Sequence, residues 1–247
     1  MARPPDPAIQ AFLSEARDNL LAYSILGDPK YVPYRWHRHV ARRLEAAVAR
    51  GRGRIMVFAP PQHGKSRLVS KQLPPWIFGK HPDWPIIAAS YGIDLAEENG
   101  QAVRDQLMSP VHAAVFPESR LDGSTTGKTY FKTTEGGLYL GTTIRGGATG
   151  FPSKVFIIDD PFKSREEAES ERVRESTKTW FTSVVYPRLA EDSLLIVMHT
   201  RWHEDDLAGW LLREHPQEDW EVVNLPALAL ESDQLGRAPG EALCPER

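Results

Sequence analysis

The chain has 247 residues, enough for one large α/β domain or one domain with a small annex. Hydrophobic residues make up 41% and charged residues 26%, so we expect a soluble protein with a buried core. The single cysteine, Cys244, excludes a disulfide within the chain and a cysteine-rich zinc site. No signal peptide and no membrane helix of ~20 apolar residues is expected. Because the net charge is −3, any contact with nucleic acid must use a local basic patch or an assembled ring.

Two helical stretches open the chain. Apolar residues at helical spacing predict a helix over residues 8–26, which the turn at 27–29 ends, and a second helix is expected over 35–50. Residues 54–59 form a short apolar run that is typical of a buried strand. A helix from about residue 64 to residue 73 is expected to follow that strand directly.

The middle of the chain predicts a strand, a helix and a hairpin. A second buried strand is expected over residues 84–91, followed by a helix over 94–108 that Pro110 limits. Residues 129–142 alternate in polarity around Glu135-Gly136-Gly137, which predicts a β-hairpin insertion.

Three further strands are expected in the last third of the chain. Residues 154–158 predict a third buried strand, followed by a charged helix over 164–183. Residues 193–200 predict a fourth strand, followed by a helix over 204–214, and residues 220–226 a fifth strand. Buried strands that alternate with helices indicate the α/β class, with a mostly parallel central sheet flanked by helices.

A phosphate-binding loop follows the first predicted strand. The string APPQHGKS at 59–66 lies between a strand and a helix, which is the context of a P-loop. In that motif Lys65 reaches the β- and γ-phosphates of ATP, the Ser66 hydroxyl ligates Mg²⁺, and helix N–H groups bind phosphate. The usual first glycine is replaced by Ala59, and an ordinary turn with a surface lysine is the alternative. The residues assigned to nucleotide binding are Pro61, Gln62, His63, Gly64, Lys65, Ser66 and Arg67.

Two carboxylates end the third strand, in the sequence VFIIDD at 155–160. This is the Walker B pattern, in which Asp159 holds Mg²⁺ and Asp160 polarises the attacking water. The alternative is a pair of capping carboxylates for the helix at 164–183.

Thr200 ends the fourth strand, next to the expected position of a γ-phosphate. A polar residue there can sense hydrolysis and pass the change onward, so we assign Thr200 a coupling role. The alternative is that this segment only caps the helix at 204–214, whose first turn would contain Glu204, Asp205 and Asp206.

Four sequence blocks together resemble the phage terminase large subunit. They are PPQHGKS (60–66), SYGIDLAEENGQAVR (90–104), TTIRGGATGFPSKVFIIDDP (142–161) and TRWHEDDLAG (200–209), in the family's order. The resemblance implies an ATP-driven motor that packages double-stranded viral DNA into a procapsid. It also implies a P-loop NTPase fold of the ASCE type.

The resemblance further implies a domain organisation and partners. Residues 1–50 would be an N-terminal helical segment that packs on an ATPase core at 51–226. Residues 227–247 would form a small linker subdomain toward a C-terminal nuclease domain that this sequence lacks. The implied partners are double-stranded DNA, further copies in a ring of commonly five subunits on the portal, and a small terminase subunit. The expected location is the host cytoplasm, without a membrane.

Further site residues follow from the same resemblance. Arg145, in a glycine-rich loop, would act in trans on a neighbour's nucleotide, with Arg67 and Arg104 as alternative arginines. Tyr34 or Trp36 would stack on the adenine base, although both could instead be core aromatics.

The DNA-contacting surface and some rival functions stay open at this stage. Two basic runs are candidates for phosphate contacts: Arg42, Arg43, Arg50, Arg52 and Arg54, and Lys163, Arg165, Arg172, Arg174 and Lys178. A helicase would share both Walker elements, and a nucleotide-binding adaptor without hydrolysis would share the fold.

Overall fold

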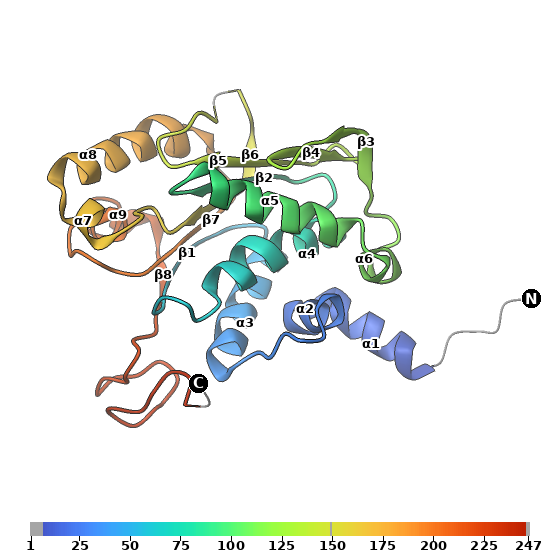
Figure 1. The fold of residues 1–247 in the computed structure, drawn as a ribbon, viewed down its shortest axis with the longest axis horizontal. Helices are drawn as coiled ribbons and strands as arrows, with labels where there is room; N and C mark the ends of the chain where they lie inside the picture. The colour runs from blue at the N-terminus through green and yellow to red at the C-terminus, as the bar shows by residue number, and fades with distance from the viewer. Residues whose placement is uncertain (1–6, 149, 246–247) are drawn as a thin grey trace, which may run out of the picture.

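A single eight-stranded sheet organises the computed structural model, which describes residues 7–148 and 150–245 (Figure 1). The strands are β1 (Gly53–Phe58), β2 (Pro85–Ser90), β3 (Leu121–Thr126), β4 (Tyr130–Thr133), β5 (Leu138–Thr143), β6 (Ser153–Asp159), β7 (Leu189–His199) and β8 (Glu221–Asn224). Their spatial order is β3-β4-β5-β2-β6-β7-β1-β8. From β5 to β8 all neighbours pair in parallel, and β3, β4 and β5 pair antiparallel. The predicted mostly parallel sheet with a hairpin insertion is confirmed.

Helices cover both faces of this sheet. They are α1 (Pro7–Asp18), α2 (Leu20–Gly27), α3 (Arg35–Arg50), α4 (Leu73–Lys80), α5 (Ile93–Leu107), α6 (Pro110–Val115), α7 (Arg165–Glu169), α8 (Glu171–Trp180) and α9 (Leu207–Glu214). Helices α1 to α6 pack on one face, and α7, α8 and α9 pack on the other. Within the described ranges, no helix is both long and apolar enough to cross a bilayer.

The alternation of side chains along each strand explains the two cores. Ile55 and Val57 of β1 belong to the cluster under α1 to α6, whereas Met56 and Phe58 belong to the cluster under α8 and α9. Successive side chains of a strand point to opposite faces, so a strand covered on both sides is apolar throughout. This is why the parallel strands are uninterrupted apolar runs in the sequence.

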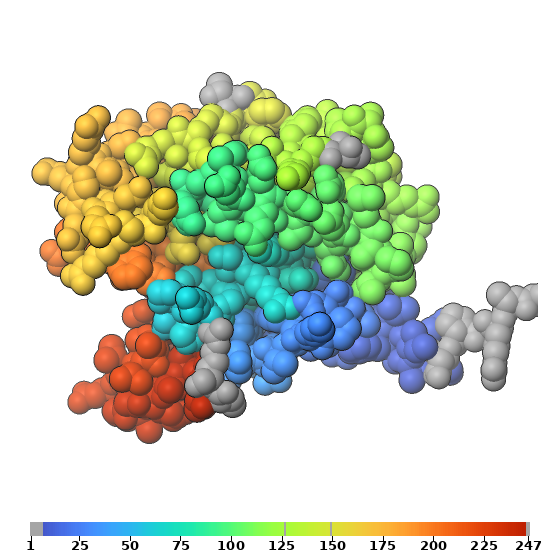
Figure 2. Space-filling view, in the orientation of Figure 1, coloured from blue at the N-terminus to red at the C-terminus, as the bar shows by residue number. Residues whose placement is uncertain are grey.

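The N-terminal helices and the C-terminal segment lie side by side on one side of the molecule (Figure 2). The predicted single helix over 8–26 is in fact two helices, because Asn19 begins a new one. The Asn19 side chain accepts hydrogen bonds from the N–H groups of Leu21 and Ala22, both at 3.0 Å. Such a cap satisfies helix donors that would otherwise have no partner, and it lets the chain change direction.

Two other helices differ from their predicted bounds. The helix predicted over 164–183 breaks at Ser170, whose extended backbone separates α7 from α8. The helix after the P-loop runs to Lys80, seven residues beyond its predicted end, through a π-helical segment at Arg67–Gln72. Pro74 and Pro75 follow this π-helical segment after Leu73, and proline has no N–H with which to continue the helical hydrogen bonds.

The predicted hairpin turn is held by glycine. Gly136 has a φ of 92°, and a Cβ on Gly137 would lie 2.3 Å from the carbonyl oxygen of Pro82. Only glycine fits so close to another backbone segment. The sequence did not predict β3, which extends the hairpin to a third antiparallel strand.

Candidate nucleotide site

The predicted site residues meet at the carboxyl edge of the parallel strands. The P-loop follows β1, Asp159 ends β6, and Thr200 directly follows β7, which lies between β1 and β6. Parallel strands bring their carboxyl ends to one edge, where α/β proteins bind ligands. Strand β7 separates the P-loop strand β1 from the acidic strand β6, and such an additional strand is the feature of ASCE-type P-loop proteins.

The backbone of the P-loop explains which residues are possible there. Gln62 has a φ of 60° and Gly64 a φ of 87°, both in the left-handed region, whereas Ala59 is not among the positive-φ residues. Glycine adopts such a φ without strain, so the backbone favours glycine at 64 and makes no such demand at 59. A Cβ on Gly64 would also lie 3.2 Å from the imidazole of His37 on α3.

Lys65 is buried beneath this loop, with 4% of its surface exposed. Its ammonium donates hydrogen bonds to the carbonyl of Ala59 (2.9 Å), the carbonyl of Pro60 (3.2 Å) and the hydroxyl of Thr200 (2.8 Å). Burial lowers the pKa of Lys65, and the charges of Asp160 and Asp159 oppose that shift. The lysine is thus held at the carboxyl edge between β1 and β7.

The residues predicted to hold Mg²⁺ are in contact. The Ser66 hydroxyl donates to Asp159 at 3.1 Å, and the Ser70 hydroxyl donates to the other oxygen of the same carboxylate at 2.6 Å. Burial, followed by the charge of Asp160, raises the pKa of Asp159. A buried carboxylate beside a hydroxyl supplies the oxygen ligands that Mg²⁺ prefers, so these residues fit the ion.

Asp160 adopts an unusual backbone conformation for a residue with a side chain, with a φ of 46°. Its N–H donates to the carbonyl of Met198 at 2.8 Å, and its carboxylate accepts the N–H of Thr200 at 3.1 Å. Residues in sparsely populated regions of φ/ψ space are concentrated at functional sites, because such strain persists only where the surrounding structure holds the residue in place.

Thr200 therefore contacts both Lys65 and Asp160. Hydrogen bonds also fix the segment that follows it. Arg201 donates to the buried carboxylate of Asp206 at 2.6 Å, and Asp206 accepts the N–H of Gly209 at 2.9 Å. Helix α9 consequently begins at Leu207. The expected first turn at Glu204 to Asp206 is wrong: the helix starts three residues later because Asp206 is its N-cap.

An ionic cluster around Asp205 was not predicted from the sequence. Its carboxylate accepts from Lys178 of α8 and from Arg213 of α9, both at 2.7 Å. Partial burial opposes ionisation, but these two hydrogen bonds prevail and lower the pKa of Asp205 to about 2. The cluster joins the Thr200 segment to the helix that follows the acidic strand.

The three candidate arginines lie in different places. Arg67 is bonded to Asp28 and lies 4.6 Å over the ring of Tyr31, and Arg104 donates to Asp105 on α5. Arg145 is exposed, with a φ of 69°, on the loop after β5. Strand β5 is four positions from β1 in the sheet, a separation of roughly 19 Å at ~4.8 Å per strand.

The two predicted adenine-stacking residues differ in exposure. Trp36 is fully buried in the core, as the alternative interpretation held, so its ring has no surface to offer a base. Tyr34 is partly exposed and stacks on His37, with ring centroids 5.7 Å apart.

Two residues of the site were not predicted from the sequence: Ser70, and His37 next to Gly64. Ser70 stands one helical turn after Ser66, and that spacing is the signal that could have identified it.

The fold and this edge define a mixed α/β protein of the P-loop type. The family described as "Terminase large subunit, T4likevirus-type, N-terminal" matches residues 56–247. The chain belongs to that family, as the sequence blocks predicted.

A solved structure supports the fold. The crystal structure of the HK97 bacteriophage large terminase is similar at a TM-score of 0.56 and 15% sequence identity. The similarity covers 90% of this chain and 46% of that one, so the chain spans less than half of that protein's length. A search of curated proteins finds no match.

Proposed function

We propose that the chain is the Mg²⁺-dependent ATPase domain of a terminase large subunit. The observation that supports this most directly is the hydrogen-bonded chain Lys65–Thr200–Asp160, which joins the ends of three neighbouring strands. A phosphate-binding lysine, a carboxylate and a polar residue between them are the groups that phosphoryl transfer to water requires.

Each residue of the site has a role in this proposal. The loop Pro61–Ser66 would bind the phosphates, with Lys65 as the cation on the β- and γ-phosphates. Ser66 and Asp159 would hold Mg²⁺, which supplies positive charge to the phosphate oxygens when it is bound. Asp160 would orient the attacking water, since its carboxylate is fixed by Thr200.

The adenine and ribose would lie on the α3 side of the loop. Tyr34 offers a partly exposed ring beside His37, which in turn lies against Gly64. Arg67 would form the wall of this side, because Asp28 and Tyr31 fix its guanidinium.

Arg145 would complete the site of a neighbouring copy. Its exposure and its separation from β1 disfavour action on the chain's own nucleotide, whereas an arginine at the outer part of the edge can reach a partner. A trans arginine stabilises charge on the transferring phosphoryl group and makes hydrolysis depend on assembly. The proposed assembly is a ring, with five subunits as the expected number.

Hydrolysis would drive the translocation of double-stranded DNA into a procapsid. Loss of the γ-phosphate changes the charge next to Thr200, and the Arg201–Asp206 and Asp205 contacts would pass the change to α9 and α8. In this proposal residues 1–50, 51–226 and 227–247 are the helical segment, the ATPase core and the linker toward a nuclease domain. The ring would sit on the portal, with the small terminase subunit as a partner, in the host cytoplasm.

The experiment is ATP turnover by Lys65→Ala beside a matched control, Lys71→Ala. Lys71 lies on the same helix but pairs with Glu98 at 2.5 Å. We expect Lys65→Ala to lose turnover by about a thousandfold or more, because no other cation replaces it, and Lys71→Ala to stay within about threefold. Undiminished turnover in Lys65→Ala would contradict the assignment of the site.

A further inference from the structure

The outer face of α3 carries a row of arginines. Arg35, Arg38 and Arg42 are exposed and recur at helical spacing on one face, while Trp36 and Val40 between them are buried. At 1.5 Å per residue the row extends over about 10 Å. We call Arg35, Arg38 and Arg42 the α3 row.

Three acids near the α3 row have partners outside it, although Glu45 and Glu15 also line a pocket with Arg38 and Arg42. Glu45, the one acid of α3, accepts the backbone N–H of Leu20 at 2.7 Å. Glu221 pairs with Arg43 at 3.1 Å, and Asp233 pairs with Arg237 at 2.6 Å. None of the α3 row forms an ion pair with a residue that the structure describes. The row is therefore a concentration of positive charge on a chain whose net charge is −3.

A groove of 360 Å³ runs along this row. Besides the α3 row it is lined by His39, Arg43, Gln234 and Leu235, so it lies between α3 and the C-terminal segment, which are neighbours in Figure 1. Burial, followed by the charge of Arg43, lowers the pKa of His39. A groove lined by guanidinium groups is a suitable site for phosphates, which accept several N–H donors at once.

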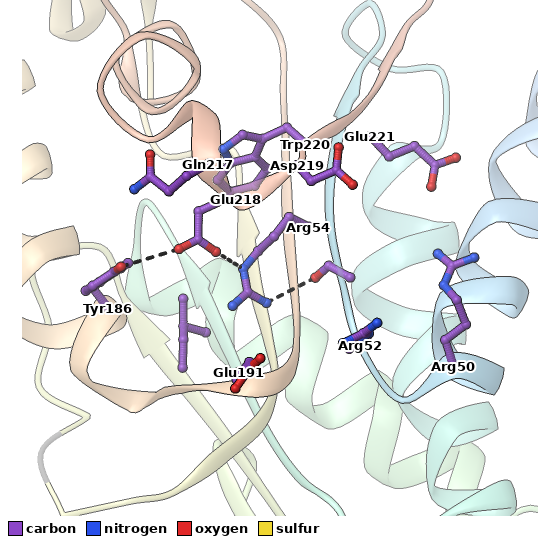
Figure 3. A pocket seen from close by; sticks show the side chains of 12 residues that line it. Arg50, Arg52, Arg54, Tyr186, Glu191, Gln217, Glu218, Asp219, Trp220 and Glu221 are labelled. Carbon is purple, nitrogen blue, oxygen red and sulfur yellow. Dashed lines mark hydrogen bonds and ion pairs between the residues drawn. The ribbon is translucent and has the colours of Figure 1, made fainter.

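The other members of the basic runs are placed differently. Arg54 donates to Glu218 at 2.6 Å inside an 830 Å³ pocket at the opposite edge of the sheet, where Arg50 and Arg52 also lie (Figure 3). Four acids line that pocket as well: Glu191, Glu218, Asp219 and Glu221. Lys178 of the second run is paired with Asp205. Such mixed charge is less favourable for a polyanion than the α3 groove.

We infer that the α3 row binds the phosphate backbone of duplex DNA. This inference rests on the proposed function, which requires contacts with DNA that do not depend on the base sequence. One strand of a duplex carries a phosphate about every 3.4 Å along its axis, so a row about 10 Å long corresponds to roughly three phosphates. Helix α3 lies outside the residues 56–247 that match the family, so the family match does not assign it this role.

The test measures binding of a fluorescent 30-base-pair duplex of random sequence by anisotropy, at several salt concentrations. The test variant combines Arg35→Gln, Arg38→Gln and Arg42→Gln. A matched control removes three exposed cations that lie outside both basic runs, as Lys30→Gln, Arg120→Gln and Lys128→Gln. We expect the salt slope of the test variant to fall by about 2.7, which at about 0.1 M salt corresponds to binding about 10²- to 10³-fold weaker than that of the wild type. The control should stay within about twofold of the wild type.

Several outcomes would overturn the inference. They are equal weakening by both variants, no binding of the duplex by the wild type, or unchanged binding by the test variant. Poly-L-glutamate is the probe for an acidic protein as the alternative ligand of the groove. If the test variant lost binding of poly-L-glutamate but kept binding of the duplex, DNA would be rejected as the ligand. If the triple variant unfolds at a lower temperature than the wild type, the single variants replace it, each expected to weaken binding about eightfold at about 0.1 M salt.

ATP turnover in the same preparations separates this inference from the proposed function. Turnover that requires Lys65, together with equal duplex binding by both variants, would reject the α3 row and leave the ATPase proposal standing. Absent turnover, together with selective loss of duplex binding in the test variant, would contradict the ATPase proposal alone.

Discussion

The ammonium of Lys65 donates a 2.8 Å hydrogen bond to the hydroxyl of Thr200, a residue 135 positions later in the chain. The backbone N–H of the same threonine donates to Asp160. One residue at the end of β7 therefore fixes the proposed phosphate-binding cation and the carboxylate proposed to orient water.

Replacing Thr200 with valine tests this relationship. Valine keeps the shape and removes the hydroxyl, so Lys65 loses a hydrogen bond that involves a charged group, worth about 1.5–3 kcal/mol. We expect kcat for ATP hydrolysis to fall about tenfold or more, with ATP binding retained. Thr200→Ser is the control and should restore most of the rate, since it returns the hydroxyl.

Asp160→Asn tests the role of the carboxylate charge. Asparagine tolerates the left-handed backbone at this position, so the change removes the charge with little disturbance of the fold. We expect kcat to fall about 10²- to 10⁴-fold, with nucleotide still bound, because the water loses its general base. Single-turnover hydrolysis measures the rate of the chemical step, and a nucleotide-binding titration measures the affinity for nucleotide. A variant as fast as the wild type would leave Asp160 with a capping role only.

Arg201→Met tests the contact that anchors the Thr200 segment. Methionine retains an unbranched apolar side chain but leaves the fully buried Asp206 carboxylate without its cation. We expect the free energy of unfolding in urea to fall by about 3 kcal/mol. The matched change Arg165→Met, at an exposed pair with Glu169, should cost less than about 0.5 kcal/mol. Equal effects of the two changes would show that the Arg201 contact adds no stability of its own.

His112 predicts a dependence of stability on pH. It is buried between the Tyr23 hydroxyl (2.8 Å) and the Ser119 hydroxyl (3.0 Å), and burial lowers its pKa from 6.5 to about 4. Above pH 6.5 the histidine is neutral in both the folded and the unfolded chain, so its contribution is complete there. As the pH falls from 6.5 to 4 only the unfolded chain binds the proton, and about 3 kcal/mol is lost.

The measurement for His112 is urea unfolding at pH 7.5 and pH 4.5, compared with His112→Gln. The variant should be less stable at pH 7.5 and should lose less free energy of unfolding between the two values. An identical loss in both proteins would contradict the role assigned to His112.

The sequence was sufficient for those parts of the fold and site that depend on local patterns. The strands β1, β2, β6 and β7 are continuous apolar runs because helices cover both of their faces. The class of fold and the family follow from these runs and from the spaced motifs. The strand order was not predicted, since no local pattern specifies which strands become neighbours.

What the sequence could not provide depends on contacts between distant segments. The burial of Trp36 and the pairing of Arg67 with Asp28 are set by how α2 and α3 pack against the P-loop helix. The helix break at Asn19 is not evident because apolar periodicity continues across it. The break at Ser170 is not evident because the charged residues on both sides are compatible with a helix, while one residue with an extended backbone decides the break. The cap at Asp206 was misjudged because three adjacent acids are all compatible with a helix start.

The most direct test of the proposed ATPase is turnover per chain as a function of protein concentration, with Lys65→Ala as the baseline. We predict a rate above that baseline that rises with concentration, because a neighbour's Arg145 completes the site. Arg145→Ala should remove the rise, and mixing it with Lys65→Ala should restore turnover, since the first variant keeps an intact P-loop and the second supplies the arginine. A rate equal to the baseline at every concentration would contradict the proposal that this chain hydrolyses ATP.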